Sequence, residues 1–220
     1  MDSKIISKKN FLIIPSKKFI FLTSRLIKNK LRNKKKIVVT GGKSFIPIYK
    51  KINFVKLNLN QKYYLSDERL VSLNSENSNF NNINKFFNVK KFIFFETSYK
   101  SKKKLRENYN RKFKSLKIDL SLLSFGEDGH IASIFFKKMK SENQLFFSKK
   151  KSRRISIPLK ILKNAKETLV LCNNKKKTLG ILKDIKEKRN FFKYFDKKNY
   201  KIIIKKSDYK ILTKKLDVKK

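Results

Sequence analysis

The sequence has very little of the residues that build disulfides and metal centres. It contains no tryptophan, one cysteine (Cys172) and one histidine (His130). A single cysteine excludes an intrachain disulfide and is typical of a reducing compartment, so we expect a cytoplasmic protein. Cys172 ends an apolar run, 168–172, which indicates a buried and unreactive thiol. With one histidine and no acidic cluster at ligand spacing, we also expect no metal and no cofactor.

Long apolar runs are missing as well. The longest apolar region, 11–27, is interrupted by Pro15 and by three basic residues, so we expect no transmembrane helix. No apolar segment leads into a small-residue cleavage site, and a secretory signal is not expected. The hydrophobic content of 40% in 220 residues is enough for a packed core. We expect one domain over 1–220, with poorly defined basic ends at 1–18 and 206–220.

Acidic residues are scarce, and the chain carries 59 Lys and Arg against 16 Asp and Glu, a formal charge of +43. Such a charge is compatible with binding to nucleic acid or to an anionic membrane surface. The alternative is compositional drift, because residues with A/T-rich codons dominate and alanine occurs only at positions 132 and 165. The basic residues are spread along the whole chain, which favours drift. We therefore expect no specific nucleic acid or membrane partner, although the charge predicts nonspecific attraction to polyanions.

Glycine is also rare, yet four of the five glycines fall in two short stretches, 41–42 and 126–129. Rare glycines gathered in this way indicate positions where the backbone or its surroundings require a small residue. The first pair follows a β-branched run, 37–39, and precedes a helix that Pro47 can open. A strand, a glycine turn and a helix start can hold a phosphate group on backbone N–H groups. The pair alone is not specific, because it fits neither the Walker nor the dinucleotide spacing.

The second glycine stretch belongs to the segment 120–136, which reads LSLLSFGEDGHIASIFF. Its apolar start, 120–125, predicts a buried strand, and 131–136 can begin a helix. The turn between them carries Asp128 and His130. In open α/β sheets, ligands bind beyond the carboxyl ends of the strands, where this turn would lie.

Apolar runs and helical spacings alternate along the rest of the chain. We expect strands at 11–14, 61–65, 91–95, 155–159, 169–171 and 200–204, helices at 19–32, 81–87 and 105–116, a short helix or turn at 160–166, a helix ending near 188, and a surface loop or short helix at 137–153. The alternation predicts an α/β fold with a mostly parallel sheet flanked by helices.

An acidic pair stands out directly after the strand expected at 61–65. Asp67 and Glu68 are followed by Arg69. One interpretation is a solvated loop pair that balances nearby lysines. The other is a general base or an acceptor for sugar hydroxyls, with the Arg69 guanidinium binding phosphate.

Three motifs occur in a characteristic order: TGGKS at 40–44, DERLV at 67–71 with SNF at 78–80, and GEDGHIAS at 126–133. Together they resemble the 6-phosphogluconolactonase family, part of the superfamily shared with glucosamine-6-phosphate deaminase and ribose-5-phosphate isomerase. The resemblance extends from about 19 to 182. It implies an open, three-layer, Rossmann-like α/β fold.

The relatives differ at identifiable positions. A deaminase resemblance would place a tyrosine at Arg69 and a catalytic glutamate at Phe135, so the lactonase resemblance is preferred. Ser124 and Phe136 depart from the pattern, since the family has a glycine and a proline there. The alternatives are a deaminase-like sugar-phosphate enzyme, or an inactive, basic relative that binds polyanions.

The resemblance implies hydrolysis of 6-phospho-D-glucono-1,5-lactone to 6-phospho-D-gluconate in the oxidative pentose phosphate pathway. The expected partner is this small-molecule phosphosugar lactone, and monomer and homodimer stay open. We hypothesise that His130 is the general base on water, that Asp128 orients the imidazole or the water, and that Asp67 contacts sugar hydroxyls. The residues expected to bind the substrate phosphate are Gly41, Gly42, Lys43, Ser44, Arg69, Arg154 and Lys176.

Overall fold

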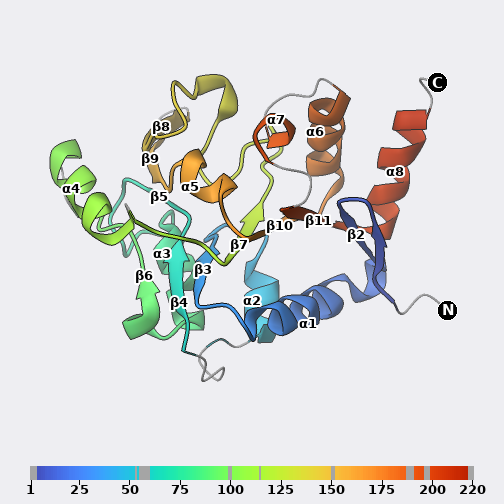
Figure 1. Cartoon of the computed structure of the whole chain (residues 1–220), viewed down its shortest axis with the longest axis horizontal. Coiled ribbons are helices and arrows are strands. Elements are labelled where there is room, and N and C mark those ends of the chain that lie inside the picture. Colours follow the sequence, from blue (N-terminus) through green and yellow to red (C-terminus); the bar gives the residue numbers. More distant parts are fainter. Residues whose placement is uncertain are drawn as a thin grey trace.

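The computed structural model describes residues 4–52, 54, 60–98, 101–113, 115–149, 152–186, 191–195 and 199–217. Over these residues the largest element is an eight-stranded sheet (Figure 1). In spatial order its strands are β1 (Ile6–Lys8), β2 (Phe11–Ile14), β11 (Tyr200–Lys205), β10 (Glu167–Cys172), β7 (Leu120–Ser124), β3 (Lys36–Val39), β4 (Lys62–Leu65) and β6 (Phe92–Ile93). All neighbouring pairs are parallel except β1 with β2. The expected mostly parallel sheet is confirmed.

Helices cover both faces of this sheet and complete three layers. One face is covered by α1 (Phe19–Leu31), α2 (Ile46–Ile52) and α3 (Asn79–Ile83), and the other by α4 (Lys102–Phe113), α5 (Leu159–Lys163), α6 (Lys175–Lys186), α7 (Phe191–Tyr194) and α8 (Lys206–Asp217). Successive side chains of a strand point to opposite faces of the sheet, so each strand contributes to two apolar clusters. In β3, Ile37 and Val39 pack in one cluster, and Val38 packs in the other. A sheet buried on both faces explains why its strands read as continuous apolar runs.

The order of the strands creates a crevice next to β3. From β3 the chain adds β4 and then β6 toward one edge, and it returns to place β7 on the other side of β3. The later strands β10 and β11 then continue toward the opposite edge. The connections therefore diverge between β3 and β7, and an open α/β sheet binds its ligands beyond the carboxyl ends at such a switch point.

A smaller antiparallel sheet lies beyond the carboxyl end of β4. It consists of β5 (Asp67–Arg69), β9 (Ser152–Ser156) and β8 (Phe146–Lys149), in the order β5-β9-β8. The expectation of a loop or short helix over 137–153 was therefore wrong where β8 and the start of β9 form. Pairing of β8 with β9 buries Phe147 in the core. The polar composition of the surrounding segment does not indicate that this residue is buried.

The segment after the β7 turn does not begin a helix, as 131–136 was expected to do. Ala132 has a φ of 48°, a left-handed conformation that interrupts helical geometry. Isolated bridges join Ile131 to Phe125 and to Ile134. Every side chain from 131 to 135 is buried, whereas a surface helix would expose part of this segment. Only a short 3₁₀ turn follows, at Phe136–Lys138.

Strands and a helix lie near both ends of the described part of the chain. Residues 4–18 contain β1 and β2, and β2 pairs in parallel with β11. Residues 206–217 contain α8. Ile13 and Ile14 of β2 and Leu212 of α8 are buried. Residues 1–3 and 218–220, and the expected helix end near 188, lie outside the described residues.

One carboxylate links the amino ends of three neighbouring strands. Asp119, just before β7, accepts hydrogen bonds from the backbone N–H groups of Lys35 and Lys36, each at 3.0 Å. It also pairs with Lys166 Nζ at 2.9 Å, just before β10. Burial raises the pKa of Asp119, but the Lys166 hydrogen bond and the two backbone donors together outweigh burial and lower it from 3.8 to about 2.

We expect Asp119→Ala to lower the free energy of unfolding at pH 7 by about 1.5–3 kcal/mol, the range for hydrogen bonds to a charged group. The folded-state pKa is depressed, so the stabilisation is present above pH 4 and is lost as the pH falls toward 2. Urea unfolding at pH 7, 4 and 2.5 measures this, with Glu107→Ala, an exposed carboxylate on α4, as control. An Asp119 variant with the same acid dependence as the wild type would contradict the assignment.

Candidate active site

A pocket of about 320 Å³ lies at the switch point, beyond the carboxyl ends of β3, β4 and β7. This is the position that the strand order predicts. The residues lining it are Thr40, Gly42, Ser44, Asp67, Arg69, Asn79, Ser124, Phe125, Gly126, Glu127, His130, Ala132, Arg154 and Lys177. All three motifs of the sequence therefore meet in one pocket.

The turn after β7 is built around close contacts that only glycine allows. A Cβ on Gly126 would collide with the imidazole ring of His130, so the ring lies directly on the backbone. Gly129 has a φ of 79°, and a Cβ there would also collide with Asp184 of α6. Larger residues at either position would displace the turn and with it His130. The clustering of rare glycines thus has a steric cause.

The His130 side chain lines the pocket and is held on two sides. Its Nδ1 contacts the carboxylate of Asp128, and its ring lies 4.8 Å from that of Phe135, centroid to centroid. The His130 side chain is 18% exposed and that of Asp128 is 48% exposed. Asp128 is not among the lining residues, so of the two only His130 faces the pocket.

Asp67 lies on the pocket wall and is almost fully buried. Its Oδ1 accepts a hydrogen bond from Ser66 Oγ at 2.7 Å, and its Oδ2 accepts one from Ser133 Oγ at 2.5 Å. Buried carboxylates require such partners. The two serines fix the carboxylate and connect the end of β4 to the segment that follows His130.

Glu68, the neighbour of Asp67, has a structural role. It is fully buried and accepts hydrogen bonds from the backbone of Arg69, Asn79 and Phe80 and from the Ser78 hydroxyl. Burial raises the pKa of Glu68, and these hydrogen bonds offset part of that effect. The carboxylate thereby secures the start of α3. The interpretation of the acidic pair as a solvated loop is wrong for both residues.

Two arginines stand side by side on the small sheet. Arg69 of β5 is the direct register partner of Arg154 of β9, and both line the pocket. Arg69 Nη1 donates to the carbonyl oxygen of Asn77 at 2.5 Å, and the Arg154 guanidinium lies 5.6 Å from the Phe135 ring centroid. The Nε atoms of both arginines are buried without a hydrogen-bond partner among the described residues. Burial, and next the charge of Arg69, lower the pKa of Arg154.

The glycine loop after β3 contributes only part of what was expected. Gly42 and Ser44 line the pocket, and a Cβ on Gly42 would meet nothing closer than 3.8 Å. Gly41 instead packs against Asn79, where a Cβ would collide. The Lys43 side chain is exposed and is not a lining residue. The structure thus brings two of these four candidates into the pocket.

The lysine of α6 that reaches the pocket is Lys177, whereas Lys176 was expected. Lys176 is exposed and is not a lining residue. Lys177 is 7% exposed, and its Nζ donates to Ser44 Oγ at 2.6 Å and to Ser124 Oγ at 2.8 Å. Burial lowers the pKa of Lys177. Helical spacing in the sequence could have identified Lys177. Ile181 lies on the buried face of α6, and Lys177 lies four residues before it, on the same face.

The structure contains neither a metal-ligand cluster nor a membrane-spanning helix within the ranges given above. No group of three or more His, Cys, Asp or Glu residues there is arranged to hold a metal ion. No helix in that part of the chain is long and apolar enough to cross a bilayer. Cys172 is buried, as expected, and burial raises the pKa of its thiol to about 11.

Comparison with known families agrees with this geometry. Residues 18–190 match the model of the family described as glucosamine-6-phosphate isomerases/6-phosphogluconolactonase. The chain belongs to this family. The match spans the three motifs and all the elements that line the pocket, and the resemblance noted in the sequence is confirmed.

Curated members of this family are recognisably similar. The chain is 38% identical over 108 residues to 6-phosphogluconolactonase of Thermotoga maritima, covering 45% of this chain and 49% of that protein. It is 34% identical over 157 residues to 6-phosphogluconolactonase of Borreliella burgdorferi, covering 61% of this chain and 66% of that protein. The matches thus span about half and about two thirds of the length of these two relatives.

The fold of a solved family member covers more of the chain. The crystal structure of 6-phosphogluconolactonase from Thermotoga maritima superposes with a TM-score of 0.74 and 26% identity, covering 86% of this chain and 95% of that one. The Rossmann-like α/β fold implied by the resemblance is confirmed.

Proposed function

We propose that this protein hydrolyses 6-phospho-D-glucono-1,5-lactone to 6-phospho-D-gluconate. One observation carries the proposal: a single pocket joins a histidine–carboxylate pair to two adjacent, partly buried guanidinium groups. The histidine–carboxylate pair can accept and return a proton. The two positively charged guanidinium groups can bind an anion. The names of the Thermotoga and Borreliella relatives support the same substrate. The reaction would place the protein in the oxidative pentose phosphate pathway, in the cytoplasm.

The phosphate group of the proposed substrate is bound by cationic side chains and by backbone groups of the pocket. Two guanidinium groups side by side repel each other, so a phosphate between Arg69 and Arg154 would relieve the repulsion and form charge-assisted hydrogen bonds. Lys177 has three donors and gives two to serine hydroxyls, which leaves the third for the substrate. The open space above Gly42 lets the substrate approach the backbone. Asp67, fixed by two serines, offers its carboxylate to sugar hydroxyls.

His130 acts as the general base. When Nδ1 donates to Asp128, Nε2 carries no proton and can accept one from water as the water oxygen attacks the lactone carbonyl carbon. Asp128 stabilises the imidazolium that forms. Collapse of the tetrahedral intermediate breaks the bond between the carbonyl carbon and the ring oxygen. The ring oxygen then takes the proton from Nε2 and leaves as a hydroxyl, so one water is added and the base is restored.

The deaminase alternative lacks support at Phe135. This position, where the deaminase resemblance would require a catalytic glutamate, holds a buried phenyl ring packed against His130. The aromatic ring supplies no proton. We therefore prefer lactone hydrolysis over deamination.

We expect His130→Asn to lower kcat for the lactone by roughly 10²- to 10⁴-fold, the usual contribution of a general base, with little change in KM. Acid release at constant pH, corrected for spontaneous hydrolysis, measures the rate. Thermal unfolding checks that the variant is folded. A kcat within tenfold of the wild type in a folded variant would rule out His130 as the base.

For the arginine pair, we expect Arg69→Met and Arg154→Met each to raise KM by about 10- to 100-fold, because each removes a charged hydrogen bond of about 1.5–3 kcal/mol. Arg153→Met is the matched control, since Arg153 precedes Arg154 in β9 and is exposed. Steady-state kinetics on the lactone distinguish the variants. Equal effects of Arg153→Met and Arg154→Met would show that general charge matters and the paired site does not.

The two lysines at the start of α6 offer a second matched pair. We expect Lys177→Met to lower kcat/KM at least tenfold, because it removes the buried ammonium group that contacts Ser44 and Ser124. Lys176→Met, an exposed neighbour, should leave kcat/KM unchanged. The reverse order of effects would restore Lys176 to the site and remove Lys177.

A further inference from the structure

A second cavity lies away from the candidate active site. Its volume is about 690 Å³, more than twice that of the first pocket. It lies between α4, α5 and the segments that lead into β7 and β10, since it includes Ile118 and Lys166. It therefore opens near the amino ends of these strands, whereas the candidate active site is at their carboxyl ends. None of the residues assigned above to catalysis or phosphate binding lines it.

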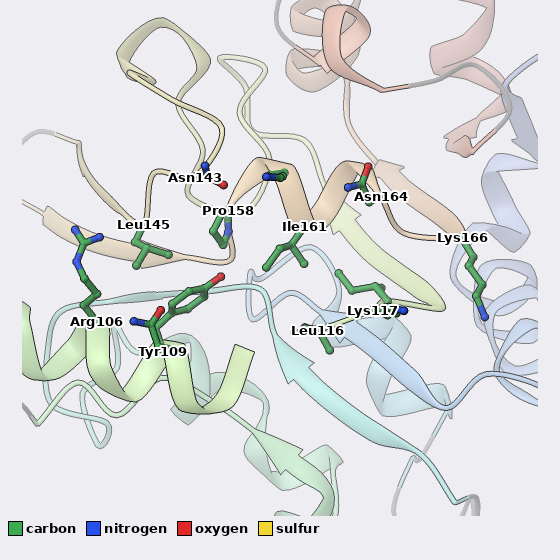
Figure 2. Close-up of a pocket in the computed structure, with 13 residues that line it drawn as sticks. Arg106, Tyr109, Leu116, Lys117, Asn143, Leu145, Pro158, Ile161, Asn164 and Lys166 are labelled. Atoms are coloured by element: carbon green, nitrogen blue, oxygen red, sulfur yellow. The ribbon is translucent and has the colours of Figure 1, made fainter. Parts of the chain in front are cut away.

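Two opposite walls of this cavity are apolar. Figure 2 shows Leu145, Pro158 and Ile161 above the open space and Tyr109 and Leu116 below it. Such opposed apolar walls can cover both faces of a flat ring. The volume is within the range of about 300–1,000 Å³ that is typical of small-molecule sites.

The rim of the cavity is cationic. Arg106, Lys117, Lys160 and Lys166 line it, and none of its thirteen lining residues is acidic. Figure 2 places Arg106 at one end and Lys166 at the other. Lys166 Nζ also pairs at 2.9 Å with Asp119, which does not line the cavity. An apolar body with negative groups at its edge would complement this lining.

Tyr109 adds a polar group to this apolar lining. The residue is 6% exposed and lines the cavity. Figure 2 shows this hydroxyl directed into the cavity, toward the space below Pro158. Burial raises the pKa of Tyr109 to about 12, so the hydroxyl remains a donor at neutral pH.

We propose that this cavity binds a nucleoside phosphate. The base lies between the apolar walls, and its polar edge pairs with the Tyr109 hydroxyl and with amide side chains from Asn110, Asn143 and Asn164, which also line the cavity. The phosphate groups contact the cationic rim. A purely aliphatic anion offers these amides and the hydroxyl no hydrogen-bond partner, so we prefer a ligand with a polar ring. The proposal does not depend on the reaction at the other pocket.

The test is calorimetric titration of the whole protein at 0.15 M KCl with ATP, adenosine, inorganic tripolyphosphate and octyl phosphate. We expect ATP to bind at least tenfold more tightly than each of the other three. Tripolyphosphate supplies the charge without the base, and adenosine supplies the base without the charge. Octyl phosphate tests the aliphatic alternative.

Variants locate the binding. Tyr109→Phe should weaken ATP about 2- to 10-fold, the effect of one hydrogen bond, and leave tripolyphosphate unchanged. Arg106→Glu should weaken ATP at least tenfold. Lys210→Glu, a matched reversal on the exposed surface of α8, and Arg154→Met in the other pocket should both leave ATP affinity unchanged.

Three results would overturn the proposal. Equal binding of ATP and tripolyphosphate would mean attraction by charge alone. Tighter binding of octyl phosphate would mean an aliphatic site. Weakening by Arg154→Met without weakening by Arg106→Glu would place the ATP in the first pocket. Thermal unfolding of each variant shows whether a loss of binding reflects a loss of fold.

Discussion

The buried ammonium group of Lys177 joins the loop after β3 to the end of β7 across the crevice. It donates to Ser44, in the loop after β3, and to Ser124, the last residue of β7. A buried charge is tolerated only with such partners, so the positions of α6, of this loop and of the end of β7 are set together. Backbone contacts complete the arrangement: a side chain on Gly180 of α6 would collide with the carbonyl oxygen of Glu127 in the His130 turn. The geometry around His130 therefore depends on how closely α6 approaches the sheet.

Much of this arrangement could be predicted from the sequence because it depends on local patterns. The apolar runs that became β3, β4, β7, β10 and β11 are buried on both faces, and continuous hydrophobicity is what such strands require. The pocket position followed from strands ending at glycines. In a chain where composition disfavours glycine, the surviving glycines lie mostly where another main chain or ring approaches within contact distance. Identifying Lys177, and not Lys176, as the lysine in the pocket required knowing which face of α6 is buried. Ile181 marks that face.

Other features depend on contacts that the local sequence does not encode. Residues 131–136 have the apolar content of a helix, and only the left-handed conformation at Ala132 and the burial of every side chain from 131 to 135 exclude one. The small sheet could not be predicted from the sequence of its polar strands. At the Arg69–Arg154 pair, β5 and β9 are 85 residues apart, and they meet only through tertiary pairing. The role of Glu68 is similar: its partners lie ten or more residues away, apart from its neighbour Arg69.

The arginine pair also has a consequence for the end of the catalytic cycle. Opening the lactone creates a carboxylate, so the proposed product carries more negative charge than the substrate while it lies beside the same two guanidinium groups. Partly buried charges interact more strongly than charges in bulk water, so the pocket would hold the proposed product more firmly than the proposed substrate. Under the proposed reaction, departure of the product, and not the chemistry, would then limit turnover at low ionic strength. Dissolved salt, which screens such attraction, would accelerate the enzyme up to the point where it also weakens capture of the substrate.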